Sequence, residues 1–151
     1  MIDQVRLYDL IKESFLLLDF GDRQFLEQYA LTVPRYYALT HIAAAPGLSP
    51  SLLSRAMFCD KSNITRLVHG LEADGLVERR PHDHDGRVQR LYLTPAGAAL
   101  QAIVAEAHCR YVRQRLAVLA ECEAEDTLAT LTRLNRALHE ELDNSPILLL
   151  N

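Results

Sequence analysis

The segment from residue 48 to residue 94 constrains the fold most, because its apolar residues change from a helical period to an alternating one. Ser49 followed by a proline is a strong helix start, and it predicts a short helix over residues 50–57. Asp60 is a suitable N-cap for a second helix, which we expect over residues 60–74. The segment therefore begins with two helices joined by a tight turn.

Two predicted strands follow these helices. Residues 76–80 combine apolar and charged side chains, and we expect them to form a strand that ends at Pro81. Residues 82–86 are polar and turn-rich, and residues 88–94 alternate between apolar and polar side chains. The pattern predicts a β-hairpin with a long polar tip.

The rest of the chain has helical periodicity. We expect these helices over residues 5–19, 32–45, 96–119 and 124–142. The apolar stripe of the first is wide, which suggests burial on two sides, for instance against a second subunit. Gly21 and Asp22 are expected to interrupt or kink the chain after it. The predicted fold class is therefore mainly α with a small β-hairpin.

The charge is unevenly distributed along the chain. The whole chain has a formal net charge of −4, an unfavourable sign for a nucleic-acid-binding protein. Residues 33–97, however, hold eight basic and six acidic side chains and form the only net-positive third. A local basic face, rather than the total charge, is what phosphate contact requires.

Several classes of protein are disfavoured by the sequence. It has no apolar run of the roughly 18–20 residues that a membrane helix needs and no signal-type start, so we expect a cytoplasmic protein. Its three cysteines lack CxxC spacing, which disfavours a disulfide framework or zinc ribbon. It also lacks a glycine-rich phosphate loop and the catalytic motifs GxSxG and HExxH. We therefore expect that the protein is not an enzyme and binds no cofactor.

Two short helices followed by a hairpin form the plan of a winged helix-turn-helix, whose second helix fits the DNA major groove. The outer face of that predicted helix carries polar and basic candidates for DNA contact: Lys61, Ser62, Asn63, Thr65, Arg66 and His69. Asn can bond adenine, and Arg can bond guanine, through two hydrogen bonds worth roughly 1–3 kcal/mol of discrimination. Arg87, near the hairpin tip, is placed to enter the adjacent minor groove.

Four segments resemble motifs of one regulator family. Residues 32–39 look like the entry to its second helix, and residues 60–68 resemble its recognition helix. Residues 71–80 are similar to its segment LExxGLVxR, and residues 85–97 to its wing motif DxRxxxVxLTxxG. These motifs are typical of MarR-type (multiple antibiotic resistance) transcription regulators.

The resemblance implies a single MarR-like domain over residues 1–151, with a winged helix-turn-helix over residues 31–97. Residues 1–30 and 98–151 would then form a helical dimerisation region. It further implies a bacterial or archaeal homodimer that recognises a pseudo-palindromic double-stranded operator and is nucleoid-associated when bound to it. The protein would then be a repressor, which a small-molecule effector releases from the DNA.

The resemblance also assigns roles to individual residues. Arg87 would reach the minor groove, with Asp85 orienting it. Two residues depart from the family pattern: Arg35 stands where the family usually has Gln, and Gly70 lies inside the recognition helix, where it costs up to about 1 kcal/mol relative to Ala.

Effector binding is expected outside the DNA-binding segment. Family members often bind small aromatic or phenolic acids between the dimer core and the winged domain, and the second helix borders that cleft. Its candidate ligand-binding residues are Arg35, Tyr37 and His41. Tyr37 and His41 lie four residues apart and share one helix face.

Other interpretations remain open. A metal-responsive regulator could use His41, His108 and Cys109 together, or the His-rich tip over residues 82–85. Cys59 precedes the recognition helix and could be redox-sensitive, although a buried structural cysteine is the better interpretation. A winged helix can also serve protein assembly without sequence-specific DNA binding.

Overall fold

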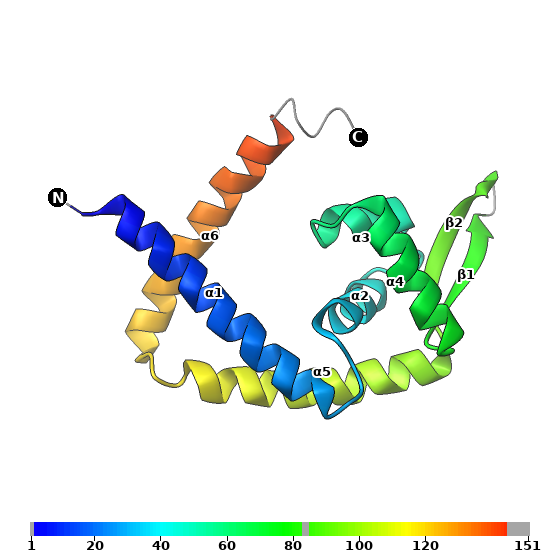
Figure 1. Cartoon of the computed structure of the whole chain (residues 1–151), viewed down its shortest axis with the longest axis horizontal. Coiled ribbons are helices and arrows are strands. Elements are labelled where there is room, and N and C mark those ends of the chain that lie inside the picture. Colours follow the sequence, from blue (N-terminus) through cyan, green and yellow to red (C-terminus); the bar gives the residue numbers. More distant parts are fainter. Residues whose placement is uncertain (1, 83–84, 145–151) are drawn as a thin grey trace. The chain divides into compact units, whose positions relative to one another are not determined.

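The computed structural model describes residues 2–82 and 85–144 (Figure 1). Its elements in chain order are α1 (Gln4–Glu27), α2 (Val33–Ala44), α3 (Pro50–Ala56), α4 (Lys61–Ala73), β1 (Val77–His82), β2 (Asp85–Leu93), α5 (Pro95–Leu116) and α6 (Glu121–Asp143). The predicted class, mainly α with one β-hairpin, is confirmed.

The chain forms two compact units, Met1–Cys109 and Arg110–Asn151, and the division falls inside α5. The first unit contains the helix-turn-helix and the hairpin, and the second contains α6. The assignment of residues 1–30 and 98–151 to dimerisation, within one domain, stays a prediction.

The helix starts predicted from capping residues are confirmed. Thr32 is the N-cap of α2, and a proline lies in the first turn of that helix. The Ser49 hydroxyl accepts a hydrogen bond from the Leu52 N–H at 3.2 Å at the start of α3. The Asp60 carboxylate accepts one from the Asn63 N–H at 2.8 Å at the start of α4. The Ser49 and Asp60 side chains satisfy N–H groups that have no partner within the helix, whereas the Thr32 side chain makes no capping hydrogen bond.

The core of the first unit lies between α2, α3, α4 and the hairpin, which Figure 1 shows side by side. Its fully buried members include Leu39, Ile42, Leu53, Leu71 and Leu91. Leu91 also ties β2 to the connection between α2 and α3, because its N–H donates to the Leu48 carbonyl at 3.0 Å. The hairpin is therefore fixed to the helices by both packing and backbone hydrogen bonds.

The end of the hairpin is joined closely to α5. The Thr94 hydroxyl donates to the Gly75 carbonyl at 2.6 Å and accepts from the Gly97 N–H at 3.0 Å. A Cβ atom at Gly97 would lie 1.9 Å from the Leu76 carbonyl oxygen. Glycine is required here because the first turn of α5 approaches the backbone that enters β1.

Two details of the predicted fold are wrong. Gly21 and Asp22 do not interrupt the first helix: α1 continues to Glu27, and Gly21 is buried within it. Packing outweighs the modest helix cost of one glycine. The prediction of a long polar tip is also wrong, because β1 continues through Pro81 to His82 and β2 begins at Asp85. Both strands of a two-stranded sheet are edges, where proline is tolerated. Residues 83–84 lie outside the described part.

Candidate nucleic-acid interface

α4 separates an apolar face from a polar one. Ile64, Val68 and Leu71 are buried against the core, at the spacing of one face of a helix. The six predicted DNA-contacting side chains of this helix are all exposed: Lys61, Ser62, Asn63, Thr65, Arg66 and His69. The structure therefore brings these candidates together on the outer face of α4. Asp85 and Arg87 belong to β2, but their side chains lie outside what the structure describes.

Hydrogen bonds connect the side chains at the start of α4. Asp60 accepts from the Ser62 hydroxyl at 2.6 Å and from the Asn63 carboxamide nitrogen at 2.7 Å. The oxygen of the same carboxamide accepts a hydrogen bond from Arg66. Thr65 donates instead to the Lys61 carbonyl at 2.8 Å. The sequence predicted Asp60 as a cap only, and its link to the base-reading candidates appears only in the structure.

The pKa of Asp60 is lowered below its ordinary value near 3.8. The largest cause is the hydrogen bond from the Ser62 hydroxyl, followed by the hydrogen bond from the Asn63 backbone N–H. Both donors favour the charged form of the carboxyl. Asp60 is therefore a carboxylate at neutral pH and a constant acceptor for its neighbours.

Several arginines of the basic central segment serve contacts within the protein. Arg79 pairs with Glu72 at 3.0 Å, and Arg90 donates to the Gly47 carbonyl at 3.1 Å. Arg80 pairs with Glu78 and lies over the ring of Tyr92, 4.5 Å from its centroid. The positive charge counted in the sequence thus overstates the charge available for phosphate.

Arg35, predicted as a ligand-binding residue, contacts the far end of α4. Its guanidinium pairs with Asp74 and donates to the Gly70 carbonyl at 3.4 Å. A cation is favourable at a helix C-terminus, where carbonyl groups are unpaired. Arg35, which departs from the family pattern, therefore links α2 to the recognition helix. A Cβ atom at Gly70, the other departure, would meet nothing within 4 Å.

A polar cluster joins α1, α2 and α5 within the first unit. One Asp22 oxygen lies 3.1 Å from the His108 Nε2, and the other accepts from the Tyr37 hydroxyl at 3.4 Å. The Tyr36 hydroxyl lies 3.4 Å from the other ring nitrogen of His108. Burial, the largest cause, raises the pKa of Tyr37, and the Asp22 carboxylate adds to this effect. Sequence reasoning missed Asp22 because its partners are distant in the chain.

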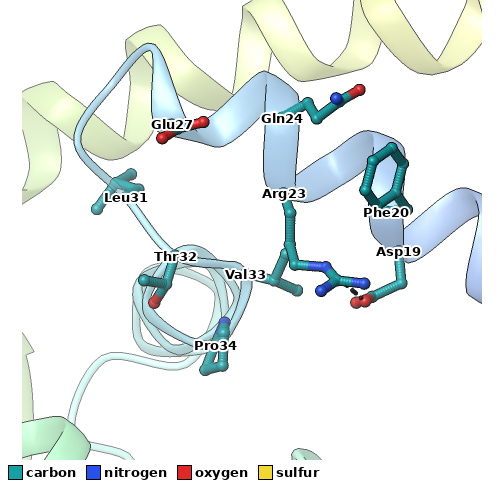
Figure 2. Close-up of a pocket in the computed structure, with 9 residues that line it drawn as sticks. All are labelled: Asp19, Phe20, Arg23, Gln24, Glu27, Leu31, Thr32, Val33 and Pro34. Atoms are coloured by element: carbon teal, nitrogen blue, oxygen red, sulfur yellow. Dashed lines mark ion pairs between the residues drawn. The ribbon is translucent and has the colours of Figure 1, made fainter.

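The predicted ligand residues line neither of two grooves on the described surface. A groove of about 760 Å³ between α1 and the start of α2 is shown in Figure 2. Its lining residues are Asp19, Phe20, Arg23, Gln24, Glu27, Leu31, Thr32, Val33 and Pro34. A smaller one lies between α2, the hairpin and α5. Arg35, Tyr37 and His41 belong to neither.

The metal and redox interpretations gain little support. Among the side chains that the structure describes, no group of three or more His, Cys, Asp or Glu is arranged to hold a metal ion. Those of the predicted tip site, His82, Asp83, His84 and Asp85, are not among them. Cys59 is half-buried, and its thiol donates to the Met57 carbonyl at 3.4 Å.

Among the residues that the structure describes, no helix has the length and apolar character for a membrane span.

A buried three-helix core, an exposed second helix of the helix-turn-helix and an antiparallel hairpin define a winged helix-turn-helix protein. A model of the MarR family matches residues 31–88. The HTH-type transcriptional regulator Mb0904 of Mycobacterium bovis is 31% identical over 104 residues, which cover 69% of this chain and 72% of that relative. The chain belongs to the MarR family, as its motifs predicted.

Two further comparisons agree with a regulator that has a winged helix-turn-helix fold. A proposed transcriptional regulatory protein for the hcr operon of Thauera aromatica is 37% identical over 101 residues, which span 67% of this chain but only 61% of that protein. The solved structure of Streptococcus pneumoniae FabT in complex with DNA has a TM-score of 0.79 at 22% identity, covering 91% of this chain and 99% of FabT. This likeness confirms the fold.

Proposed function

We propose that the protein is a sequence-specific DNA-binding transcription regulator that binds a pseudo-palindromic operator as a homodimer. The outer face of α4 carries this proposal. It presents Asn63 and Arg66, two side chains able to bond base edges, on an exposed helix that a buried core holds in place. FabT, which shares this fold, is seen with DNA in its solved structure. Because its partner is chromosomal DNA, we place the protein in the cytoplasm.

The composition of that face favours DNA over the alternatives. A helix used for protein assembly would present an apolar centre depleted of charged residues, whereas α4 presents polar and basic groups. We further infer that the protein is not an enzyme, because the named relatives are transcription regulators.

Exposed apolar side chains support the homodimer. On α1 they include Leu7, Leu10, Phe15, Leu16, Leu17 and Phe20. No residue of α6 is buried within the protomer, although the helix carries Leu128, Leu131, Leu134, Leu138 and Leu142. Apolar patches of this extent mark interaction sites in soluble proteins. A second copy of the chain would cover both helices.

We propose that a small aromatic or phenolic acid releases the DNA through α2. Tyr37 and His41 lie one helical turn apart on that helix, and Arg35 lies at its start. An anionic effector that binds Arg35 would compete with Asp74 and so loosen the end of α4. Loss of thermal stabilisation by phenolic acids in an Arg35→Gln variant would support this route; stabilisation by divalent metals alone would instead favour a metal-responsive regulator.

Selection from random duplex DNA tests the proposed function. We expect the purified protein to enrich two related half-sites whose centres lie about 10 base pairs apart, one helical turn of DNA. Arg66→Ala and Arg87→Ala should each weaken binding to the enriched duplex. Arg113→Ala, which removes the same charge from an exposed position on α5, should not. Enrichment of no sequence would refute the proposal.

A further inference from the structure

The carboxamide of Asn63 is held at both ends. Its nitrogen donates to Asp60 at 2.7 Å, and its oxygen accepts from Arg66. An amide has a donor end and an acceptor end, and here each faces the charge that it complements. The reversed orientation would place the oxygen against a carboxylate and the NH2 group against a guanidinium. The two charged neighbours therefore fix the orientation of this side chain.

Asp60 is itself held in place. It accepts from the Ser62 hydroxyl and from the Asn63 backbone N–H as well as from the Asn63 side chain. Its lowered pKa means that the carboxylate keeps its charge at neutral pH. The cap of α4 is thus a fixed anchor, and Asn63 connects this anchor to Arg66 one turn further along.

This arrangement leaves Asn63 less free for base contact than Arg66. A carboxamide has two N–H donors and two oxygen lone pairs, and Asp60 and Arg66 each engage one of them. A base contact by Asn63 would have to use the remaining N–H and lone pair in the orientation that these two neighbours set. Arg66 is less committed, because a guanidinium carries five N–H donors and its bond to Asn63 leaves donors for guanine.

We propose that Asn63 is a positioning residue that connects Asp60 to Arg66, and that Arg66 reads a guanine in each operator half-site. This inference rests on the proposed function and makes it more specific. The main base contact of α4 is from Arg66 to guanine, and Asn63 orients Arg66 for that contact instead of contacting a base itself. Asp60, Asn63 and Arg66 form one recognition unit.

Base preferences of matched variants test this proposal. Arg66→Ala should lower the preference for guanine at one base pair of each half-site by about 5- to 150-fold, the range for one paired contact. Asn63→Ala should weaken the preference at that same base pair. Asp60→Ser, which keeps a good N-cap but offers no second oxygen to Asn63, should do likewise. The variant with both Asn63→Ala and Arg66→Ala should match Arg66→Ala alone.

A different pattern would overturn the proposal. If Asn63→Ala abolishes a preference for adenine at a separate base pair, and its effect adds to that of Arg66→Ala, Asn63 reads DNA directly. Arg113→Ala, at an exposed position of α5 outside the proposed interface, is the control, and helix content by circular dichroism shows that each variant is folded. If the wild-type protein selects no sequence, the proposed function fails first; if it selects one and these variants act independently, only the recognition unit fails.

Discussion

At the residue scale, Asp60 caps α4 and is also the anchor of the proposed recognition unit. Its hydrogen bonds lower its pKa, so the folded state favours the carboxylate more than the unfolded state does. Such a group stabilises the fold above its unfolded pKa, and this contribution is lost as the pH falls through the folded pKa. The relevant window therefore lies below about pH 4, near and under the ordinary value of 3.8.

Asp60→Asn separates the charge from the cap, since Asn is an equally good N-cap and does not titrate. We expect the free energy of unfolding of the wild-type protein to exceed that of Asp60→Asn by a constant amount above pH 5. The difference should shrink as the pH falls below about 4. Urea denaturation of both proteins between pH 2 and pH 7 measures it. A difference independent of pH would contradict the role of the charge.

Two glycines are expected to respond oppositely to the same substitution. Gly70→Ala should stabilise the protein by about 0.5–1 kcal/mol, because Gly70 is helical and a Cβ there meets no atom within 4 Å. Gly97→Ala should destabilise it by about 1–3 kcal/mol, because the added Cβ meets the Leu76 carbonyl. Thermal and urea unfolding at one protomer concentration compare them. Equal effects would show that the close approach at Gly97 does not hold.

At the element scale, the predicted helices of the DNA-binding segment follow from local chemistry. Ser49 and Asp60 marked helix starts that the structure confirms, because a cap depends on residues two or three positions away. The interruption at Gly21 was predicted wrongly, because burial of that residue is a tertiary effect that the local sequence does not carry.

The contacts between elements were not predictable in this way. Arg35 meets Asp74, 39 residues further along the chain, and Asp22 meets His108 across 86 residues. Hydrophobic periodicity indicates which face of a helix is buried but not which polar side chains pair across helices. The outer face of α4 was foreseen; the network within it was not.

The cluster around Asp22 is expected to hold α1, α2 and α5 together. Asp22→Ala would leave His108 and the Tyr37 hydroxyl each without this partner, so it should cost about 1–3 kcal/mol of unfolding free energy. Asp9→Ala, on an exposed position of the same helix, should cost less than about 0.5 kcal/mol. Urea denaturation at fixed protomer concentration gives both values. Equal losses would argue against the cluster as a link between helices.

At the scale of the whole molecule, α6 has exposed leucine side chains that nothing within one protomer buries. Leu134→Glu places a charge among exposed leucines and should weaken the homodimer at least about tenfold. Asn135→Glu adds the same charge at the neighbouring position and should leave the dimer unchanged. Sedimentation equilibrium measures the dissociation constant of each variant. A dimer that tolerates Leu134→Glu would show that this face of α6 is not part of the interface.

The central claim, that this MarR-family protein recognises a DNA sequence through α4, is tested most directly by binding to an enriched operator and to a scrambled duplex across a salt series. We predict at least about 1,000-fold tighter binding to the operator at physiological salt, with both affinities falling steeply as salt rises. Equal affinity for the two duplexes would contradict the claim, however strongly the protein binds.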